Sequence, residues 1–398
     1  MVTTHKRFLL ALLFCFGATI LPVFVLNLIL LNNTLDNSEK VLLASKWQQI
    51  THGVTYAPTL SDTHLFKTLR LNDRLPGINT VVFGSSTALG ITQSAFPANM
   101  HIYNYAQTGH ALTATISEAE YLQQHAPQVK WLIVPMDWSI GFIYEKSPVM
   151  QADLSPESTL QQAASPMGRP PLLARMRDAL SWPRVATLLK ILTSTLGGED
   201  ITAAFRGYFI EAGSQEYRCN DGTAAKDFDI INRGSCTGFR HDGSATFANS
   251  ARVSNAAALI ALSVASNSKY RSHLVESRGI PSNNLLEHLA QIAKRARTHG
   301  GELVLFMPPL LPGLEAEFLR HSELAVPLTR TKRTLNTWAR AHNITILDFG
   351  QSERFGCISG EFLDEHHAVA SCYEKVFHQS RRDMFKPNDT TTFHGGLM

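Results

Sequence analysis

Charged residues are scarce in this chain. They occupy 17% of its 398 positions, and 36 Lys and Arg against 33 Asp and Glu leave a formal net charge of +3. A soluble domain usually carries about 25% charged residues. The shortfall excludes a disordered acidic or basic tail protein, which needs high charge and few apolar residues. The small net charge also excludes a strongly electrostatic nucleic-acid-binding protein, so we expect no nucleic acid among its partners.

Cysteine is scarce as well, and none of the five residues forms a closely spaced pair such as C-x2-C, which a zinc site needs. Cys15 lies in an apolar run, and the other four form two local pairs, Cys219 with Cys236 and Cys357 with Cys372. Four cysteines in an oxidising compartment allow three connectivities. We expect local pairing, since each bridge would close a loop of about fifteen residues and add about 3 kcal/mol in the chain-entropy model.

Long apolar runs are nearly absent, and a mean hydropathy of −0.05 argues against a protein with several membrane spans. The exception is residues 8–31, FLLALLFCFGATILPVFVLNLILL, which carry no charge. About 20 such residues span a bilayer as a helix. Lys6 and Arg7 precede the run and no base follows it closely, so the positive-inside rule predicts export of everything after it. We therefore predict a cytoplasmic tip at 1–7 and a single transmembrane anchor at 8–31.

Two other interpretations of the apolar run stay open. A cleaved signal peptide has an apolar region of only about 7–15 residues and a small-x-small cleavage site, and no convincing site follows this run. A cytosolic enzyme with a buried N-terminal helix is the second, and two disulfides in the native protein would argue against it.

The remaining chain alternates apolar runs with amphipathic stretches. After a polar stalk or entry segment at 32–78, we predict strands at 80–83, 101–105, 131–135, 302–307 and 344–349. Helices are expected at 112–124, 285–299, 328–342 and 368–384. The strand runs are apolar without alternation, as in a parallel sheet covered on both faces. The sequence thus predicts an α/β domain at 79–385 with a mostly parallel sheet, an insertion at about 147–284 containing helices near 172–196 and 251–267, and a polar tail at 386–398.

Polar residues follow the predicted strands, and ligands bind at the carboxyl ends of strands in such sheets. Ser86 follows the first strand, and Asp364 and His367 follow the last, where we expect them to open the final helix. A serine hydroxyl needs an imidazole to take its proton, and the imidazole needs a carboxylate to fix its tautomer. Asp and His three residues apart can meet on one side of a first helical turn. The pattern therefore predicts a Ser86, His367 and Asp364 triad.

The motifs resemble those of the SGNH (GDSL-like) hydrolases. Gly84-Ser85-Ser86-Thr87 is similar to the family's G-D-S-L block with Ser in place of Asp, and residues 104–109, NYAQTG, resemble its second block. Residues 364–367, DEHH, match its D-x-x-H block. The resemblance implies a flavodoxin-like three-layer fold, Ser86 as nucleophile, His367 as base and Asp364 as its partner. It also implies an oxyanion hole made by the N–H groups of Ser86 and Gly109.

The third block departs from the family. Asp137 stands near the place of an asparagine that donates to the oxyanion, and an ionised carboxylate only accepts hydrogen bonds. The sequence leaves Asp137 open between a substrate or structural contact and solvation at the strand end. Asn104 is open between a turn residue and a substrate contact. We interpret His366 as a solvated neighbour, and we expect no metal or cofactor, because adjacent histidines do not easily converge with Asp364 on one ion.

The resemblance is strongest to membrane-anchored bacterial relatives concerned with acyl groups of the cell envelope. It implies an inner-membrane protein with a periplasmic catalytic domain, acting as a serine acyl esterase or O-acyltransferase on an envelope glycan. The partners would be the glycan or acyl-ester substrate, the inner membrane and an acyl-donor membrane protein that the sequence does not identify. The alternative is a catalytically inactive SGNH-like domain that binds glycan or assists assembly.

Overall fold

The computed structural model describes residues 37–55, 63–144, 216–226, 228, 236–247 and 251–380, together with Arg7, Val25, Thr193 and 196–198. The predicted anchor at 8–31, apart from Val25, and the predicted tail at 386–398 lie outside the described residues. So does the helix expected near 172–196, apart from Thr193 and Leu196. Across the part of the chain that is described, no helix combines the length and the apolar character needed to cross a membrane.

The main sheet has five strands, all parallel, in the order β10-β9-β4-β2-β3. Each strand lies where an apolar run predicted it: β2 at Thr80–Val82, β3 at Ile102–Asn104, β4 at Trp131–Pro135, β9 at Glu302–Met307 and β10 at Thr345–Asp348. Numbered in chain order, the strands follow 2-1-3-4-5, which is the flavodoxin-like arrangement. The predicted α/β class with a mostly parallel sheet is therefore confirmed.

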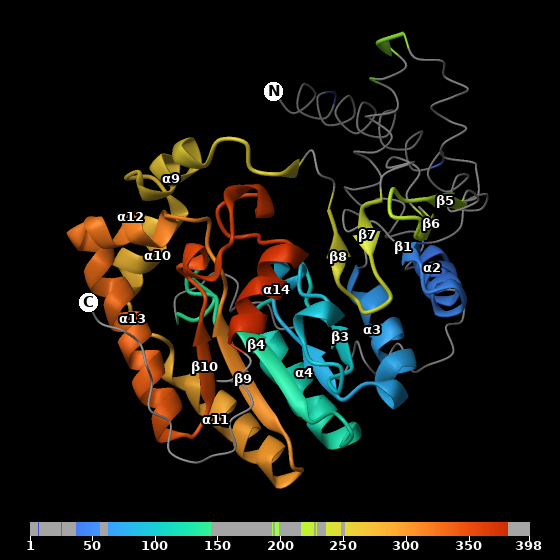
Figure 1. The fold of residues 1–398 in the computed structure, drawn as a ribbon, viewed down its shortest axis with the longest axis horizontal. Helices are drawn as coiled ribbons and strands as arrows, with labels where there is room; N and C mark the ends of the chain where they lie inside the picture. The colour runs from blue at the N-terminus through green and yellow to red at the C-terminus, as the bar shows by residue number, and fades with distance from the viewer. Residues whose placement is uncertain are drawn as a thin grey trace.

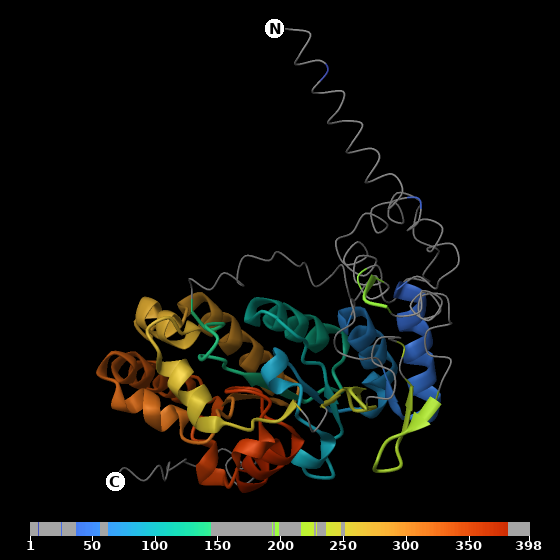
Figure 2. The same cartoon turned by 90° about the horizontal axis from the view of Figure 1, so that it is seen from above.

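Helices cover both faces of this sheet (Figures 1 and 2). On one face α4 (Leu112–His125) packs against α11 (Asn283–Thr298), and Gln123 donates to the Ile292 carbonyl at 2.8 Å. On the other face lies α14 (Ala370–Gln379), whose Phe377 contacts Phe306 of β9 with ring centroids 5.5 Å apart. Helices α12 (Leu314–Arg320) and α13 (Ser322–Ala341) connect β9 to β10.

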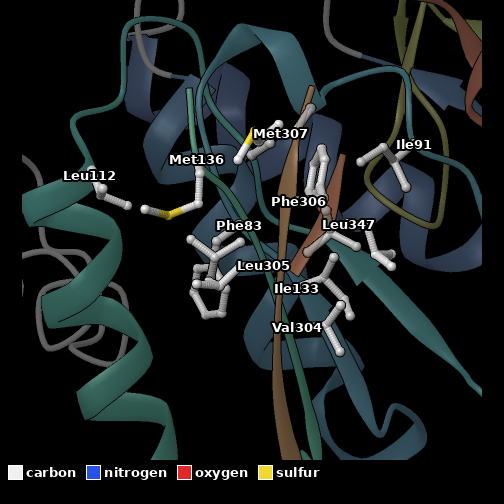
Figure 3. Close-up of a cluster of buried hydrophobic side chains, with 14 of the residues drawn as sticks. Phe83, Ile91, Leu112, Ile133, Met136, Val304, Leu305, Phe306, Met307 and Leu347 are labelled. Carbon is white, nitrogen blue, oxygen red and sulfur yellow. The ribbon is translucent and has the colours of Figure 1, made fainter. Parts of the chain in front are cut away.

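The core forms where successive strand residues point to opposite faces of the sheet. Leu305 and Phe306 of β9 lie on opposite sides of the strand, and both are fully buried (Figure 3). Phe83, Ile133 and Met136 extend the apolar cluster across the central strands. This packing holds the strand ends, and the residues that follow them, in fixed positions.

A second, smaller sheet lies beside β3 and was not predicted. It has the order β5-β6-β1-β7-β8, formed by β1 (Val54–Thr55), β5 (Glu216–Arg218), β6 (Ala224–Lys226), β7 (Gly238–Phe239) and β8 (Ala245–Thr246). The Asp242 carbonyl accepts from the Asn104 N–H at 2.7 Å, which joins the two sheets. The insertion thus contributes to the same folded body as the main sheet.

The segment at 32–78, expected as a stalk or an entry segment, packs on the main domain where it is described. Helices α2 (Asn37–Thr51) and α3 (Thr63–Arg74) occupy much of it, followed by the 3-10 turn η1 (Leu75–Gly77). Val41 and Ala44 of α2 and Phe66 and Leu71 of α3 are fully buried in the main core. Since the apolar residues face inward, this segment is part of the domain and not a separate stalk.

Other element bounds also differ from the sequence prediction. The helix expected near 251–267 is the shorter α9 (Ala256–Val264), and it is followed by α10 (Lys269–Ser277), which was not predicted. Helix α13 begins six residues before position 328, at Ser322. The described part of the last helix, α14, starts at Ala370, so Asp364 and His367 lie in a loop before it and not in its first turn. Short 3-10 turns complete the described part: η2 (Ser86–Ala88), η3 (Gln93–Ala95), η7 (Ser352–Phe355) and η8 (Ser359–Glu361).

Candidate active site

Ser86 is placed by a sharp turn at the end of β2. Gly84 has φ of 124°, and a Cβ there would lie 2.2 Å from Cγ of Pro135 on the neighbouring strand. Only glycine combines this backbone conformation with so close an approach. The Ser85 side chain accepts from the Thr87 N–H at 3.4 Å and caps η2, which begins at Ser86. The turn leaves Ser86 half-buried at the carboxyl end of the strand.

Ser86, His367 and Asp364 come together as the sequence predicted. Nε2 of His367 lies 2.7 Å from Oγ of Ser86, and Nδ1 of the same ring lies 2.6 Å from Oδ2 of Asp364. With the carboxylate accepting from Nδ1–H, Nε2 carries a lone pair toward the serine hydroxyl. The three side chains therefore form a continuous relay that can take a proton from Ser86.

Asp364 also organises the loop that carries His367. Its Oδ1 accepts from the backbone N–H groups of His366 and His367, both at 2.9 Å. Burial alone would raise the pKa of Asp364, but the hydrogen bond from His367 and the charge that this ring carries when protonated outweigh it and hold the pKa well below its usual range. The carboxylate thus remains ionised, as the orienting member of a relay must be.

The N–H groups predicted for the oxyanion hole lie in the turn that carries Ser86 and in the loop after β3. The loop after β3 is tied to residues 84–87, the turn that carries Ser86 and is called the nucleophile turn below, because the Gln107 N–H donates to the Gly84 carbonyl at 2.9 Å. Gly109, two residues on, is exposed and has φ of 70°. Within the described ranges, the N–H groups of Ser86 and Gly109 have no acceptor. Free N–H groups on a fixed turn are what an oxyanion hole uses.

His110, the residue directly after Gly109, belongs to a largely buried cluster that the sequence did not reveal. His110 Nε2 lies 2.8 Å from Oε2 of Glu118 on α4, and His64 Nε2 on α3 lies 3.1 Å from Oε1 of the same carboxylate. Burial would raise the pKa of Glu118, but His110 and His64 outweigh it and lower that pKa. The cluster anchors the loop that carries Gly109 to two helices.

Asn104 does not face a substrate, which corrects the expectation that it might contact one. The side chain is completely buried. Its Nδ2 donates to the carbonyls of Ala88 and Ile91, both at 2.8 Å, and its Oδ1 accepts from the Ala106 N–H at 3.0 Å. Because backbone groups occupy both ends of the amide, Asn104 fixes the loops on either side of the site.

Asp137 is a buried carboxylate that accepts hydrogen bonds from the nucleophile turn and from Ser139. It is 2% exposed, so it is neither solvated nor open to a substrate. Oδ2 accepts from Thr87 Oγ1 at 2.7 Å and from Ser85 Oγ at 3.3 Å, whereas Oδ1 accepts from Ser139 Oγ at 3.0 Å. Burial raises the pKa of Asp137, and these hydrogen bonds and the charge of His367 oppose that rise. Of the open interpretations, the structural contact is the one observed.

His366 is not the solvated neighbour that the sequence suggested. Its side chain is only 6% exposed, and Nδ1 lies 2.6 Å from the hydroxyl of Tyr270 on α10. That hydroxyl also donates to Oε1 of Glu365 at 2.6 Å. Burial, followed by the charge of His367, lowers the pKa of His366 to about 3. His366 is therefore a neutral, buried residue directly beside the relay.

Two members of the relay, Asp364 and His367, also form a candidate metal centre together with His366. Asp364, His366 and His367 place possible ligand atoms within 4.8 Å of one another. Both Nδ1 atoms already make contacts of 2.6 Å, His367 with Asp364 and His366 with Tyr270. A cation bound through those two nitrogen atoms would break both contacts.

Both predicted cysteine pairs form disulfides. Cys357 is bonded to Cys372, and Cys219 to Cys236. The first bridge matters to the site, because the loop between Cys357 and Cys372 contains Asp364 and His367 and the bridge fastens it to α14. The second bridge lies at the small sheet.

Comparison with known proteins adds no assignment, since no family model and no curated protein matches this chain. The chemistry must be argued from the site itself.

Proposed function

We propose that this protein is a serine acyl esterase or O-acyltransferase that works through an acyl-enzyme on Ser86. The observation that carries the proposal is the relay, in which His367 Nε2 lies 2.7 Å from Ser86 Oγ and Nδ1 lies 2.6 Å from Asp364. The alternative, an inactive glycan-binding domain, needs no such contact. A distance this short is within the range for proton transfer, and it favours catalysis.

In the first step Ser86 Oγ attacks the ester carbonyl carbon while its proton passes to His367 Nε2. The carbonyl oxygen becomes an oxyanion, which the N–H groups of Ser86 and Gly109 would stabilise. The bond from carbon to the leaving oxygen then breaks, and His367 returns the proton to that oxygen. Asp364 stabilises the imidazolium throughout.

In the second step a hydroxyl group attacks the acyl-enzyme and gives its proton to His367. The bond from carbon to Ser86 Oγ breaks, and the serine recovers the proton. Water as the attacking group makes the protein an esterase, and a sugar hydroxyl makes it an acyltransferase. The motif resemblance and the proposed export point to an envelope glycan in the periplasm as the substrate class, with residues 8–31 as the inner-membrane anchor.

A direct test uses the detergent-solubilised full-length chain and a serine-reactive fluorophosphonate. We expect covalent labelling of Ser86, located by mass spectrometry, and turnover of p-nitrophenyl acetate. Ser86→Ala should abolish both, whereas Ser117→Ala, a change at another half-buried hydroxyl, which donates to the Thr113 carbonyl on α4, should keep Ser86 reactive. Equal ester hydrolysis by the wild type and Ser86→Ala would contradict the proposal.

A further inference from the structure

His366 has no role in the two steps above, although it is buried and its ring packs against that of His367. The tautomer follows from its neighbours. The Tyr270 hydroxyl has one proton, which it donates to Glu365 Oε1 at 2.6 Å, because a carboxylate oxygen only accepts. The hydroxyl oxygen must then accept from His366 Nδ1 at 2.6 Å. The proton of neutral His366 is therefore on Nδ1, and Nε2 is an unprotonated acceptor.

The direction of Nε2 follows from Asp364. Nδ1 of His367 lies 2.6 Å from Oδ2, and Nδ1 of His366 lies 3.5 Å from Oδ1 of the same carboxylate. The two rings are neighbours, with centroids 4.1 Å apart and planes inclined by 40°. Since both rings turn Nδ1 toward Asp364, both direct Nε2 away from it. His366 Nε2 therefore lies at the edge of its ring that is directed away from Tyr270 and Asp364, in a ring that packs against the ring of His367.

His366 Nε2 accepts no hydrogen bond from the described part of the protein. No donor to His366 Nε2 is present among residues 37–55, 63–144, 216–226, 236–247 and 251–380. The residue is nevertheless held firmly by Tyr270 and by the hydrogen bond from its own N–H to Asp364 at 2.9 Å. A fixed, unprotonated and unpartnered nitrogen on a ring that packs against His367 is suited to receive a hydrogen bond from a ligand.

We infer that His366 Nε2 binds a second hydroxyl hydrogen of the acyl acceptor, and that this makes the site selective for acceptors that carry two such hydrogens close together. This inference rests on the proposed acyl-enzyme mechanism. The attacking hydroxyl gives its only proton to His367, so His366 must accept from another O–H. Water supplies that hydrogen itself, and a sugar supplies it from a vicinal hydroxyl, but a monohydric alcohol has none.

The role concerns only the second step. Acylation of Ser86 brings no acceptor hydroxyl into the site, so labelling by a fluorophosphonate should not depend on His366. Deacylation should depend on it, because the bound hydroxyl fixes the orientation of the attacking oxygen. His366 is therefore a positioning residue for the acceptor.

The test follows acyl transfer from p-nitrophenyl acetate on the full-length chain, with ethylene glycol or ethanol as added acceptor. The variant His366→Asn keeps an amide donor near the position of Nδ1 for Tyr270 and removes the acceptor at Nε2. We expect labelling of Ser86 within twofold of the wild type and deacylation by water at least tenfold slower. The wild-type preference for glycol over ethanol should fall at least fivefold. His366→Gln, whose amide oxygen reaches toward the position of Nε2, should recover part of both losses.

The outcomes separate the two proposals. A wild type that is not labelled at Ser86 overturns the acyl-enzyme and this inference with it. Normal labelling with an unchanged glycol preference in His366→Asn overturns the inference alone. Equal losses of labelling and deacylation also overturn it, because they would show a general structural role for His366.

Discussion

Oγ of Ser86 lies 2.7 Å from Nε2 of His367, although 281 positions separate the two residues in the chain. Several contacts bring the two segments together. The Tyr373 hydroxyl of α14 donates to the Thr87 carbonyl, directly beside Ser86. On the other segment, the Leu363 N–H donates to the His367 carbonyl at 2.9 Å and closes the loop. Tyr373 thus ties the segment of Ser86 to α14, and the Leu363 contact fixes the loop that carries His367.

The first prediction concerns Asp364→Asn. An amide cannot accept from Nδ1 and stabilise an imidazolium as a carboxylate does, so we expect kcat for p-nitrophenyl acetate to fall roughly a thousandfold or more. The control is Asp221→Asn. Asp221 also accepts from a turn N–H, that of Thr223 at 2.9 Å, but it lies beside the small sheet. Its substitution should leave kcat within twofold, and a similar loss in both variants would contradict the role of Asp364.

The same carboxylate gives stability a pH dependence of known sign. The pKa of Asp364 is lowered in the folded protein. Its contribution is therefore complete above the unfolded pKa of about 3.9 and is lost as the pH falls through the lower folded value. The difference in unfolding free energy between the wild type and Asp364→Asn should narrow as urea titrations move from pH 6 toward pH 3. A difference that grows with acidification would contradict this sign.

A further prediction compares the two hydroxyl groups that donate to the two carboxylate oxygens of Asp137. Thr87→Val removes the hydroxyl that donates to Oδ2 at 2.7 Å, next to Ser86, and Ser139→Ala removes the one that donates to Oδ1 at 3.0 Å. Each change removes a hydrogen bond to a buried charged group and should cost about 1–3 kcal/mol of unfolding free energy. Only Thr87→Val loosens the nucleophile turn, so its kcat should fall about tenfold further with KM nearly unchanged. Equal kcat values in the two variants would show that Asp137 does not position Ser86.

The strands and the relay could be predicted from the sequence because their signals are local. Each strand of the main sheet is a short apolar run, and parallel strands bring the residues that follow them to one edge of the sheet. Ser86 lies just beyond the first of these runs, and the Asp364 to His367 motif follows the last one after two 3-10 turns. Their meeting therefore needed only the topology and the spacing within each motif.

The features that were missed depend on distant partners. Strand β1 has two residues, Val54–Thr55, which is too short for any periodicity, and it is a strand only because β6 and β7 pair with it. The burial of His366 depends on Tyr270, 96 positions earlier and inside the insertion. Asn104 and Asp137 were left open for the same reason, since their partners lie in other segments. Local sequence does not show such contacts.

The last prediction compares the loss of one disulfide with the loss of the other. The bridge between Cys357 and Cys372 spans 15 positions and that between Cys219 and Cys236 spans 17, so the chain-entropy model gives both a contribution of about 3 kcal/mol. Replacing either pair by alanine should lower the urea midpoint by a similar amount. Only the first pair holds the loop of Asp364 and His367 on α14, so only its loss should also lower kcat, by tenfold or more. We expect the Cys219 and Cys236 variant to keep kcat within twofold at a temperature where both proteins are folded. A loss of kcat that follows stability equally in both variants would show that the bridge does not position the relay.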